Sequence, residues 1–331
     1  MTRAEDHRLV QILGGEEMVR VMIAKSELSP VEPPKFSDWT RGHTQGLLTK
    51  LGGEEIARKI ATGELTCKIM DGVAVVEVAT NPFFDHTGRG IPFKGMGGFV
   101  DENRVFHHDQ FQVEYRGRYV RAKEYFGRGC KFMSVGEFEA RCNAVLEFVH
   151  QSTRIGNLLA RPYFPWVMPQ LDGDLSQMLD GVLVPAMERA YRAQFPNRGF
   201  TNHRHGELAR QVTVVTETRQ ERLIDAMAKG SVCGVYFPAL QGFGIPADRE
   251  FIKRIPETRL ILSGVEVPAV VTAYPDVCGS NYNTPGLDMA ALQWQSSAYS
   301  LCFRAGDGGA RFVRRNLLAD GDYAGGVSVL G

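Results

Sequence analysis

Two histidines separated by a single residue, His203 and His205, have the type and spacing most suited to chemistry in this sequence. Neutral imidazole is a common ligand of divalent metals, and one extended segment can present two of them to the same ion. A complete site needs one or two further ligands from a distant segment. Candidates for that role are His86, His107, His108 and Asp109. The sequence therefore predicts a divalent-metal site if the fold brings these segments together.

The same histidines overlap a tetrapeptide, Arg204-His205-Gly206-Glu207. It resembles the Arg-His-Gly-Glu signature of the histidine phosphatase and phosphoglycerate mutase superfamily. The resemblance implies a phosphate-handling hydrolase in which His205 accepts the phosphoryl group and Glu207 assists. In that family the tetrapeptide ends the first strand and a second histidine lies far downstream, whereas no histidine follows His205 in this chain. A phosphohistidine site would therefore lack its partner.

A basic and aromatic stretch at residues 115–131 suggests a different chemistry. Aromatic rings interleaved with cations can stack the bases and neutralise the phosphates of a single-stranded nucleic acid. The residues that would do so are Arg116, Arg118, Tyr119, Arg121 and Lys123. Along a strand, however, the same alternation is typical of a sheet that has one face exposed to solvent and the other packed on the core. Both interpretations stay open at the level of sequence.

Other motifs with a known mechanism are missing. The loop from Gly88 to Gly98 holds five glycines and Lys94, but it fits neither the Walker phosphate-binding loop of nucleoside triphosphatases nor the dinucleotide fingerprint. The chain has no Gly-x-Ser-x-Gly elbow. Its six cysteines are scattered without a Cys-x-x-Cys pair, which argues against a zinc ribbon and against a dense disulfide framework. They are expected to be buried, reduced thiols.

Composition places the chain among ordinary globular proteins. Apolar residues make up 44% and charged residues 23% of the 331 residues, while Lys plus Arg and Asp plus Glu balance at 38 each. A neutral chain has no general attraction for nucleic acid or for an anionic membrane. No apolar stretch has the length of a signal peptide or of a membrane span. We therefore expect a soluble protein in the cytoplasm.

The pentapeptide Leu-Gly-Gly-Glu-Glu occurs twice, at residues 13–17 and 51–55. Apolar residues at helical spacing precede and follow each copy, so residues 1–64 are expected to form a duplicated helical hairpin module. The two glutamates fall in the first turn of the second helix, where they offset the positive end of its dipole. They occupy the place where an anion would bind, so we interpret the repeat as structural. Such short helices need a partner surface, so this module is expected either to pack on the rest of the chain or to dock on a protein partner.

Residues 65–130 are expected to be rich in strands. Alternating apolar residues around Asp71-Gly72 predict a hairpin at residues 65–79 with a two-residue turn. A second antiparallel pair is predicted at residues 112–115 and 119–126, with its turn at Arg116-Gly117.

Residues 131–210 are expected to be mainly helical. Ser134 and Glu137 have the spacing of a capping box and predict a helix with an apolar face. The proline-dense residues 161–169 break this pattern, helices resume after Asp174, and Pro185 is expected to begin a new one.

Residues 211–331 are expected to form an α/β unit. Strands are predicted at residues 211–215, 231–237 and 259–262, separated by helices from residues 218 and 246, and this alternation favours a partly parallel sheet. Asp307-Gly308 predicts the turn of a C-terminal antiparallel hairpin. The fold class is therefore α+β or mixed α/β.

The stretch from Tyr274 to Phe312 resembles the tail of a bacterial family of unknown function, predicted from genomes of uncultivated small-celled lineages, and residues 231–257 resemble the same group. The resemblance covers about the last third of the chain and implies a bacterial intracellular origin without implying an activity. Our leading hypothesis is a non-catalytic binding or structural component. The alternatives are a metal- or phosphate-handling hydrolase using His203, His205 and Glu207, and a protein that binds single-stranded nucleic acid through residues 115–131.

Overall fold

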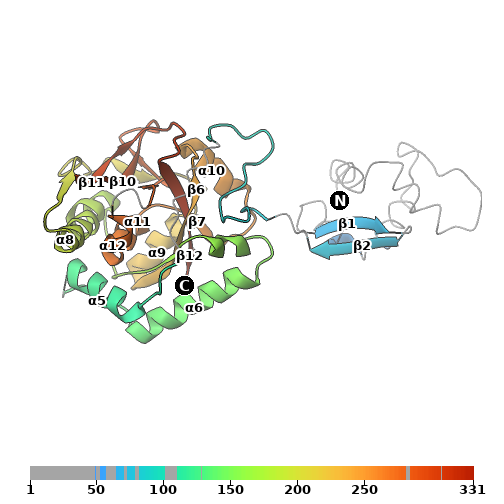
Figure 1. The fold of residues 1–331 in the computed structure, drawn as a ribbon, viewed down its shortest axis with the longest axis horizontal. Helices are drawn as coiled ribbons and strands as arrows, with labels where there is room; N and C mark the ends of the chain where they lie inside the picture. The colour runs from blue at the N-terminus through green and yellow to red at the C-terminus, as the bar shows by residue number, and fades with distance from the viewer. Residues whose placement is uncertain are drawn as a thin grey trace, which may run out of the picture. The chain divides into compact units, whose positions relative to one another are not determined.

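A computed structural model describes residue 49 and residues 53–56, 65–70, 73–78, 82–100, 110–127, 129–280, 284–306 and 308–331, with only the backbone of 65–70 and 73–78. The chain divides into two compact units, Met1–Asn81 and Pro82–Gly331 (Figure 1).

The described part of the first unit contains the predicted hairpin. Strand β1 (Leu65–Met70) pairs antiparallel with β2 (Val73–Val78), in a register that runs from Leu65 opposite Val78 to Met70 opposite Val73. This register leaves a two-residue connection, as the sequence predicts. Residues 54–56 are helical, but the duplicated helical hairpins otherwise lie outside the described residues and stay a prediction.

The second unit is built on a mixed eight-stranded sheet. Its path is β3-β6-β12-β8-β10-β11-β4, and β7 pairs with β12 beside this path. The pairs β12–β8 and β11–β4 are parallel, and the other described pairs are antiparallel. The strands are β3 (Phe164–Met168), β4 (Gly199–Asn202), β6 (Val232–Gln241), β7 (Leu260–Leu262), β8 (Gly286–Asp288), β10 (Ser300–Gly306), β11 (Gly309–Arg315) and β12 (Tyr323–Leu330). A separate two-stranded sheet joins β5 (Val212–Val214) to β9 (Leu292–Trp294).

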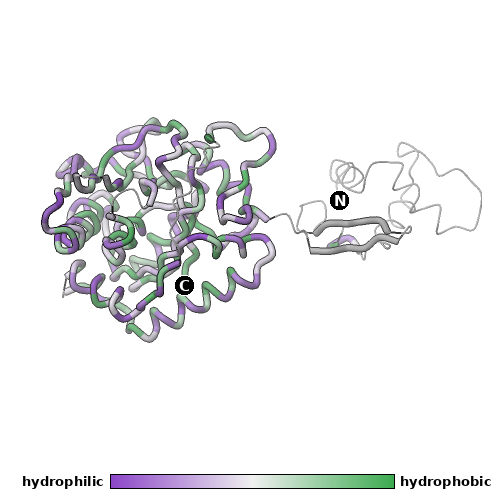
Figure 2. Tube along the Cα trace, viewed as in Figure 1, coloured by the Kyte–Doolittle hydropathy of each residue, from purple (hydrophilic) through white to green (hydrophobic). Residues whose placement is uncertain are grey.

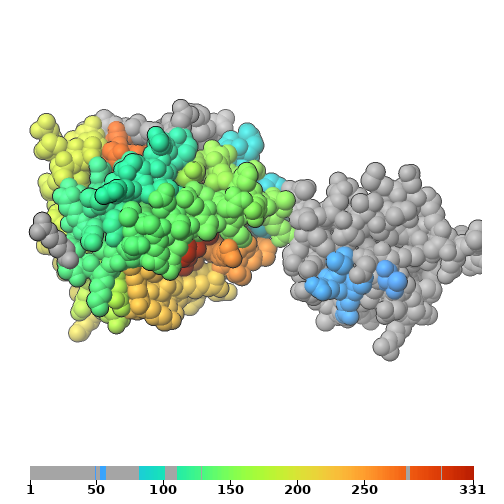
Figure 3. Space-filling view, turned by 90° about the horizontal axis from the view of Figure 1, so that it is seen from below, coloured from blue at the N-terminus to red at the C-terminus, as the bar shows by residue number. Residues whose placement is uncertain are grey.

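Helices cover both faces of the large sheet. Helix α11 (Glu266–Ala273) contacts β3 and packs against α5 (Tyr115–Phe126) and α8 (Val184–Gln194), while α6 (Val135–Gln151) contacts β6. Figure 3 shows α5 and α6 side by side on the surface of the second unit. Apolar residues gather along the central strands in Figure 2, and polar residues alternate with them along the outer helices. The other helices of the described residues in this unit are η2 (Gly156–Ala160), α7 (Leu175–Met178), η3 (Leu179–Leu183), α9 (Glu221–Lys229), α10 (Ile245–Arg254) and α12 (Pro275–Cys278).

The predicted strand pair at residues 112–126 is wrong, because residues 115–126 form α5. Glu114 caps this helix by accepting a hydrogen bond of 2.6 Å from the Gly117 backbone N–H, so the glycine that suggested a turn lies in the first helical turn. Tyr115, Tyr119, Ala122 and Phe126 are spaced three and four residues apart and share the helix face that packs inward. The prediction interpreted a period of 3.6 as a period of two.

The helix expected after Ser134 is confirmed as α6. The Ser134 hydroxyl accepts a hydrogen bond of 3.2 Å from the Glu137 N–H, and Phe138, Cys142, Val145 and Val149 are buried. Asp174 likewise caps α7 by accepting from the Gln177 N–H at 3.0 Å.

The predicted break in the helical pattern at residues 161–169 is confirmed, and the structure adds that residues 164–168 form a strand, β3, whose residues are all buried. This strand lies at one end of the sheet path, where Pro165 can lack an N–H without removing a central hydrogen bond. Pro185 lies in the first turn of α8, as predicted, but α8 continues directly from α7 and the π-helical η3. The wider turns of η3 directly precede Pro185, which is how a helix accommodates a missing N–H.

The hairpin and the order of strands and helices predicted for residues 211–331 are confirmed. Strands β10 and β11 form the expected hairpin, from Ser300 opposite Arg315 to Gly306 opposite Gly309. The strands and helices expected between residues 211 and 262 are present as β5, α9, β6, α10 and β7. The sheet is partly parallel, although the parallel pairs involve β4, β8, β11 and β12 rather than successive strands of that segment.

Candidate functional site

Three polar residues form a row across neighbouring strands near one end of the sheet. Arg304 on β10 lies directly opposite Arg311 on β11, and Arg311 lies directly beside Thr201 on β4. Residues paired in this way project from the same face of a sheet. We call these three residues the arginine row. The hairpin turn sets the register between β10 and β11, and the parallel pairing of β4 with β11 sets the position of Thr201, so the three residues fall into one row.

A row of glycines lies two residues further along the same strands, toward the hairpin end. Gly306 is opposite Gly309, and Gly309 is beside Gly199. Residues two apart along a strand share a face, so this glycine row is on the face of the arginine row. Gly309 is required by the backbone: its φ is +142°, and a Cβ there would lie 2.0 Å from the Gly199 carbonyl oxygen.

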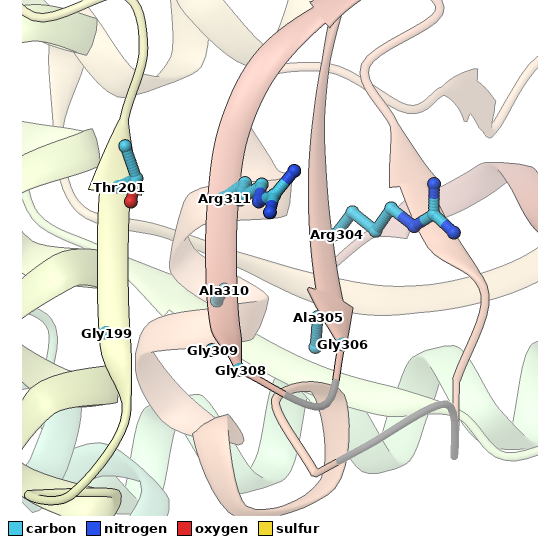
Figure 4. A pocket seen from close by; sticks show the side chains of 9 residues that line it. All are labelled: Gly199, Thr201, Arg304, Ala305, Gly306, Gly308, Gly309, Ala310 and Arg311. Carbon is cyan, nitrogen blue, oxygen red and sulfur yellow. The ribbon is translucent and has the colours of Figure 1, made fainter.

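The two rows line an open hollow of about 420 Å³ (Figure 4). Its other lining residues, Ala305, Gly308 and Ala310, are small, so backbone forms most of the floor. Figure 4 shows the Arg304 and Arg311 side chains on adjacent strands, with Thr201 on the far side of β11. The hollow therefore presents two guanidinium groups and a hydroxyl beside a floor with few side-chain atoms.

The two arginines of this hollow differ in their partners among the described residues. Two like charges at directly opposed positions destabilise a strand pair. Arg304 donates a hydrogen bond of 3.1 Å to the Tyr323 hydroxyl and lies 3.7 Å from an Asp322 carboxylate oxygen. Arg311 is exposed and forms no ion pair with any carboxylate in the described part of the chain. An added anion between the arginines would relieve this repulsion.

A buried acidic cluster continues the same face into the core. Cys302, two residues before Arg304, is paired with Asp288 on β8. The Asp288 carboxylate lies 3.4 Å from Nε of Arg315, and both side chains are almost completely buried. The Arg315 guanidinium stacks 3.9 Å from the centre of the Tyr323 ring, which Arg304 also contacts. Tyr323 therefore joins the arginine row to the buried cluster.

Asp248 of α10 is the second buried carboxyl group of this cluster. It packs on Gly325 of β12, where a Cβ would lie 2.3 Å from Asp248 Oδ2. The glycine is therefore needed to make room for the carboxyl group. All four carboxyl oxygens of Asp248 and Asp288 are buried, and within the described part of the chain none accepts a hydrogen bond. A charged carboxylate in such a place is costly, so protonation is favoured.

The titration behaviour of the cluster follows from burial. Burial raises the pKa of Asp288 to about 7, although Arg315 opposes this rise. Burial and the neighbouring Asp288 raise the pKa of Asp248 well above its usual value. Burial also raises the pKa of the Cys302 thiol, so that this cysteine is not a thiolate at neutral pH. The cluster can hold protons, but it offers no activated nucleophile.

The predicted histidines lie in the turn that follows β4. His203 and His205 are exposed, and the His203 N–H donates to the Phe312 carbonyl at 3.0 Å. Arg204 forms an ion pair of 2.6 Å with Glu207 and stacks 4.7 Å from the Trp294 ring. The arginine and glutamate of the tetrapeptide thus bind each other.

The metal site and the phosphoryl-transfer role stay predictions. His107, His108 and Asp109 lie outside the described residues, so their distance from His205 is not defined. Within the described ranges, no three His, Cys, Asp or Glu side chains are placed to hold a metal ion.

The residues expected to bind nucleic acid lie on α5. Arg118 and Arg121 both form ion pairs with Asp276, at 2.6 and 3.2 Å. The Tyr119 hydroxyl donates to the Met133 carbonyl at 2.7 Å, and its ring packs against Phe132. Arg116 and Lys123 are exposed. Nucleic-acid binding by this helix also stays a prediction. The Tyr119 side chain packs within the protein.

Sequence reasoning missed the arginine row and the acidic cluster. The hairpin turn predicted at Asp307-Gly308 was a usable signal for part of the row, because a two-residue turn there places Arg304 opposite Arg311. No local pattern identifies Thr201, Asp248 or Asp288, which come from separate elements.

Comparison of the chain with protein-family models, with curated proteins and with solved structures gave no match. Over the described residues, no helix combines the length and the apolar character that crossing a bilayer requires.

Proposed function

We propose that the second unit binds a small ligand carrying a phosphate or similar oxyanion at the arginine row. The observation that carries this proposal is the register of the hairpin, which sets Arg304 and Arg311 directly opposite each other in an open hollow. Guanidinium groups donate pairs of parallel hydrogen bonds to oxyanions, and the Thr201 hydroxyl can donate another. This proposal agrees with the binding role that the sequence favours.

Electrostatics supports the choice of an anion. Among the described residues Arg311 has no carboxylate partner, and the Asp322 carboxylate oxygen lies 3.7 Å from Arg304. Because the opposed arginines repel each other, an anion between them gains two attractive contacts and also removes a destabilising one. Charge-assisted hydrogen bonds of this kind are each worth about 1.5–3 kcal/mol.

The experiment is calorimetric titration of the full chain with inorganic phosphate, at low and at physiological salt. Arg311→Ala should weaken binding about tenfold or more, because one charge-assisted contact is lost. Arg314→Ala is the matched control, since Arg314 is exposed on the same strand but on its other face, where it stacks against Tyr299. This control should change the affinity by no more than about twofold.

The proposal fails if phosphate does not bind at millimolar concentration, or if Arg311→Ala and Arg314→Ala weaken phosphate binding equally. Arg311→Lys separates charge from geometry. A lysine keeps the charge but loses the bidentate fork, so we expect an affinity between those of the wild type and the alanine variant.

A further inference from the structure

We propose that Cys142 and Cys233 are a redox-sensitive pair, which a hydroperoxide oxidises to a disulfide that ties α6 to β6. This inference is independent of the proposed function, because neither cysteine lines the hollow of the arginine row. It assigns a covalent modification to the second unit, which a reducing thiol would reverse.

The fold places the two thiols on facing elements. Cys142 is on the inward face of α6, together with Phe138 and Val145, and is completely buried. Its thiol donates a hydrogen bond of 3.5 Å to the Gly234 carbonyl, so α6 lies directly on β6 at this level. Cys233 precedes Gly234 on β6 and is also buried.

The surroundings of Gly331 locate the Cys233 sulfur independently. A Cβ built on Gly331 would lie 3.1 Å from Cys233 Sγ and 3.4 Å from the backbone carbonyl carbon of Arg141, the atom bonded to the Cys142 nitrogen. Cys233 Sγ therefore faces the turn of α6 that carries Cys142, and a hydrogen bond links the two thiols. Thiols in such contact need to approach by only about 2 Å to reach the length of an S–S bond, about 2.05 Å.

This arrangement distinguishes the pair from the other cysteine side chains that the structure describes. Cys130, Cys278 and Cys302 have no cysteine among the described groups that influence their pKa values. A thiol without such a neighbour cannot form a disulfide within the chain unless the backbone moves. Cys142 and Cys233 can do so with the helix and the strand in place.

The cover of Cys233 provides a route for a small oxidant. Gly331 lies over the sulfur and is exposed. Its N–H donates to the Cys233 carbonyl at 3.0 Å, and Arg141 donates to its carbonyl at 3.4 Å. Breaking two hydrogen bonds at the surface is a local opening, which costs far less than unfolding the whole unit. Hydrogen peroxide is small enough to enter through such an opening, whereas a bulky disulfide is not.

Cys233 is the thiol that reacts first. Burial raises the pKa of the Cys142 thiol well above its usual value, and the hydrogen bond with Cys233 raises it further, so Cys142 is the poorer attacking group. The Cys233 sulfur attacks one peroxide oxygen, the O–O bond breaks, and the released hydroxide takes up the thiol proton to form water. The product is a sulfenic acid on Cys233.

Cys142 completes the reaction. Its sulfur attacks the Cys233 sulfur, the S–S bond forms, and the sulfenic oxygen leaves as hydroxide, which takes up the Cys142 proton to form a second water. The two thiols have then lost two electrons, and one molecule of peroxide has been reduced to two molecules of water.

The test treats the folded full chain with hydrogen peroxide near neutral pH. The protein is then unfolded in acid, alkylated and digested for mass spectrometry. We expect a pair of peptides joined through Cys142 and Cys233, which separates on reduction with dithiothreitol. Cys130 is the internal control, because it is more exposed than either cysteine of the pair. It should be oxidised to a sulfenic or higher acid without forming a disulfide within the chain.

Two variants test the assignment and its effect. Cys233→Ser should abolish the cross-link, whereas the matched control Cys130→Ser should leave its yield unchanged. Oxidation should raise the urea midpoint of the wild type by about 1 M, because the disulfide restricts the unfolded chain between residues 142 and 233. It should not raise the midpoint of Cys233→Ser. Cys142→Ser replaces this variant if it does not fold, and the wild-type measurements need neither.

Three results would overturn the inference. The first is full alkylation of both Cys142 and Cys233 in protein whose Cys130 has been completely oxidised. The second is a set of cross-links that join other cysteines in equal yield, which would indicate random pairing in unfolded chains. The third is a Cys142–Cys233 cross-link that leaves the urea midpoint unchanged, because the bond would then not tie α6 to β6.

Discussion

Replacing the buried Asp288 by asparagine should stabilise the protein at alkaline pH and have little effect at acid pH. The pKa of Asp288 rises from its ordinary 3.8 to about 7 on folding, because the carboxyl group is buried. The folded state therefore holds the proton more tightly than the unfolded state. The associated penalty is absent below pH 3.8, grows as the pH rises toward 7, and is complete above 7.

The size of this effect follows from the same shift. Each pH unit corresponds to about 1.4 kcal/mol of differential protonation, so the full penalty is about 4 kcal/mol. An asparagine side chain has nearly the same shape as the protonated aspartic acid and carries no charge at any pH. The variant should therefore match the wild type near pH 4 and exceed its stability by up to about 4 kcal/mol at pH 8.

Urea unfolding between pH 4 and pH 8.5 measures this difference, with the fluorescence of the buried Trp166 and Trp294 as the signal. Asp172→Asn is the control, because it removes a carboxyl group that is exposed. A stability difference between Asp288→Asn and the wild type that is the same at pH 5 and pH 8 would refute the reasoning. So would a wild type that gains stability relative to the variant as the pH rises.

Two further changes test the packing that supports the site. Gly309→Ala should destabilise the protein by about 2 kcal/mol or more in urea unfolding, because the φ of Gly309 is +142° and the new Cβ would meet the Gly199 carbonyl. In the control Gly308→Ala the new Cβ meets no atom within 4 Å, so the loss of stability should be less than about 1 kcal/mol. Equal losses of stability in the two variants would contradict this account. Arg118→Ala should lower the free energy of unfolding by about 1–2 kcal/mol, because it removes the ion pair with Asp276 and the stacking on Tyr274. Arg116 is exposed, so the control Arg116→Ala should change the free energy of unfolding by less than about 0.5 kcal/mol. An Arg118→Ala variant as stable as the wild type would show that these contacts do not stabilise α5.

The elements that the sequence predicts well are those with local causes. Ser134 begins a helix because its hydroxyl satisfies a backbone N–H three residues later, and β10 and β11 form a hairpin because a two-residue turn requires particular backbone angles that the sequence between them favours. Both interactions involve neighbours in the chain. The same holds for the hairpin of β1 and β2, where residues 71 and 72 connect the strands.

The errors and omissions have distant causes. Residues 164–168 form a strand because β6 pairs with them, and β6 lies more than sixty residues away along the chain. Asp248 comes close enough to Asp288 to raise its own pKa because α10 packs on Gly325, which no local pattern reveals. The arginine row likewise depends on β4 joining β11 in parallel, a pairing that separates Thr201 from Arg311 by more than a hundred residues.

The position of β12 has a consequence for how the second unit is made. This strand follows all others of the large sheet in chain order, yet it pairs with β6, β7 and β8 in the middle of that sheet. While the ribosome is still adding residues 323–330, the edges of β6 and β8 have no partner between them. The two halves of the sheet can therefore join only after this strand has emerged, and the nascent chain exposes unpaired strand edges until then, which is the situation in which chaperones bind.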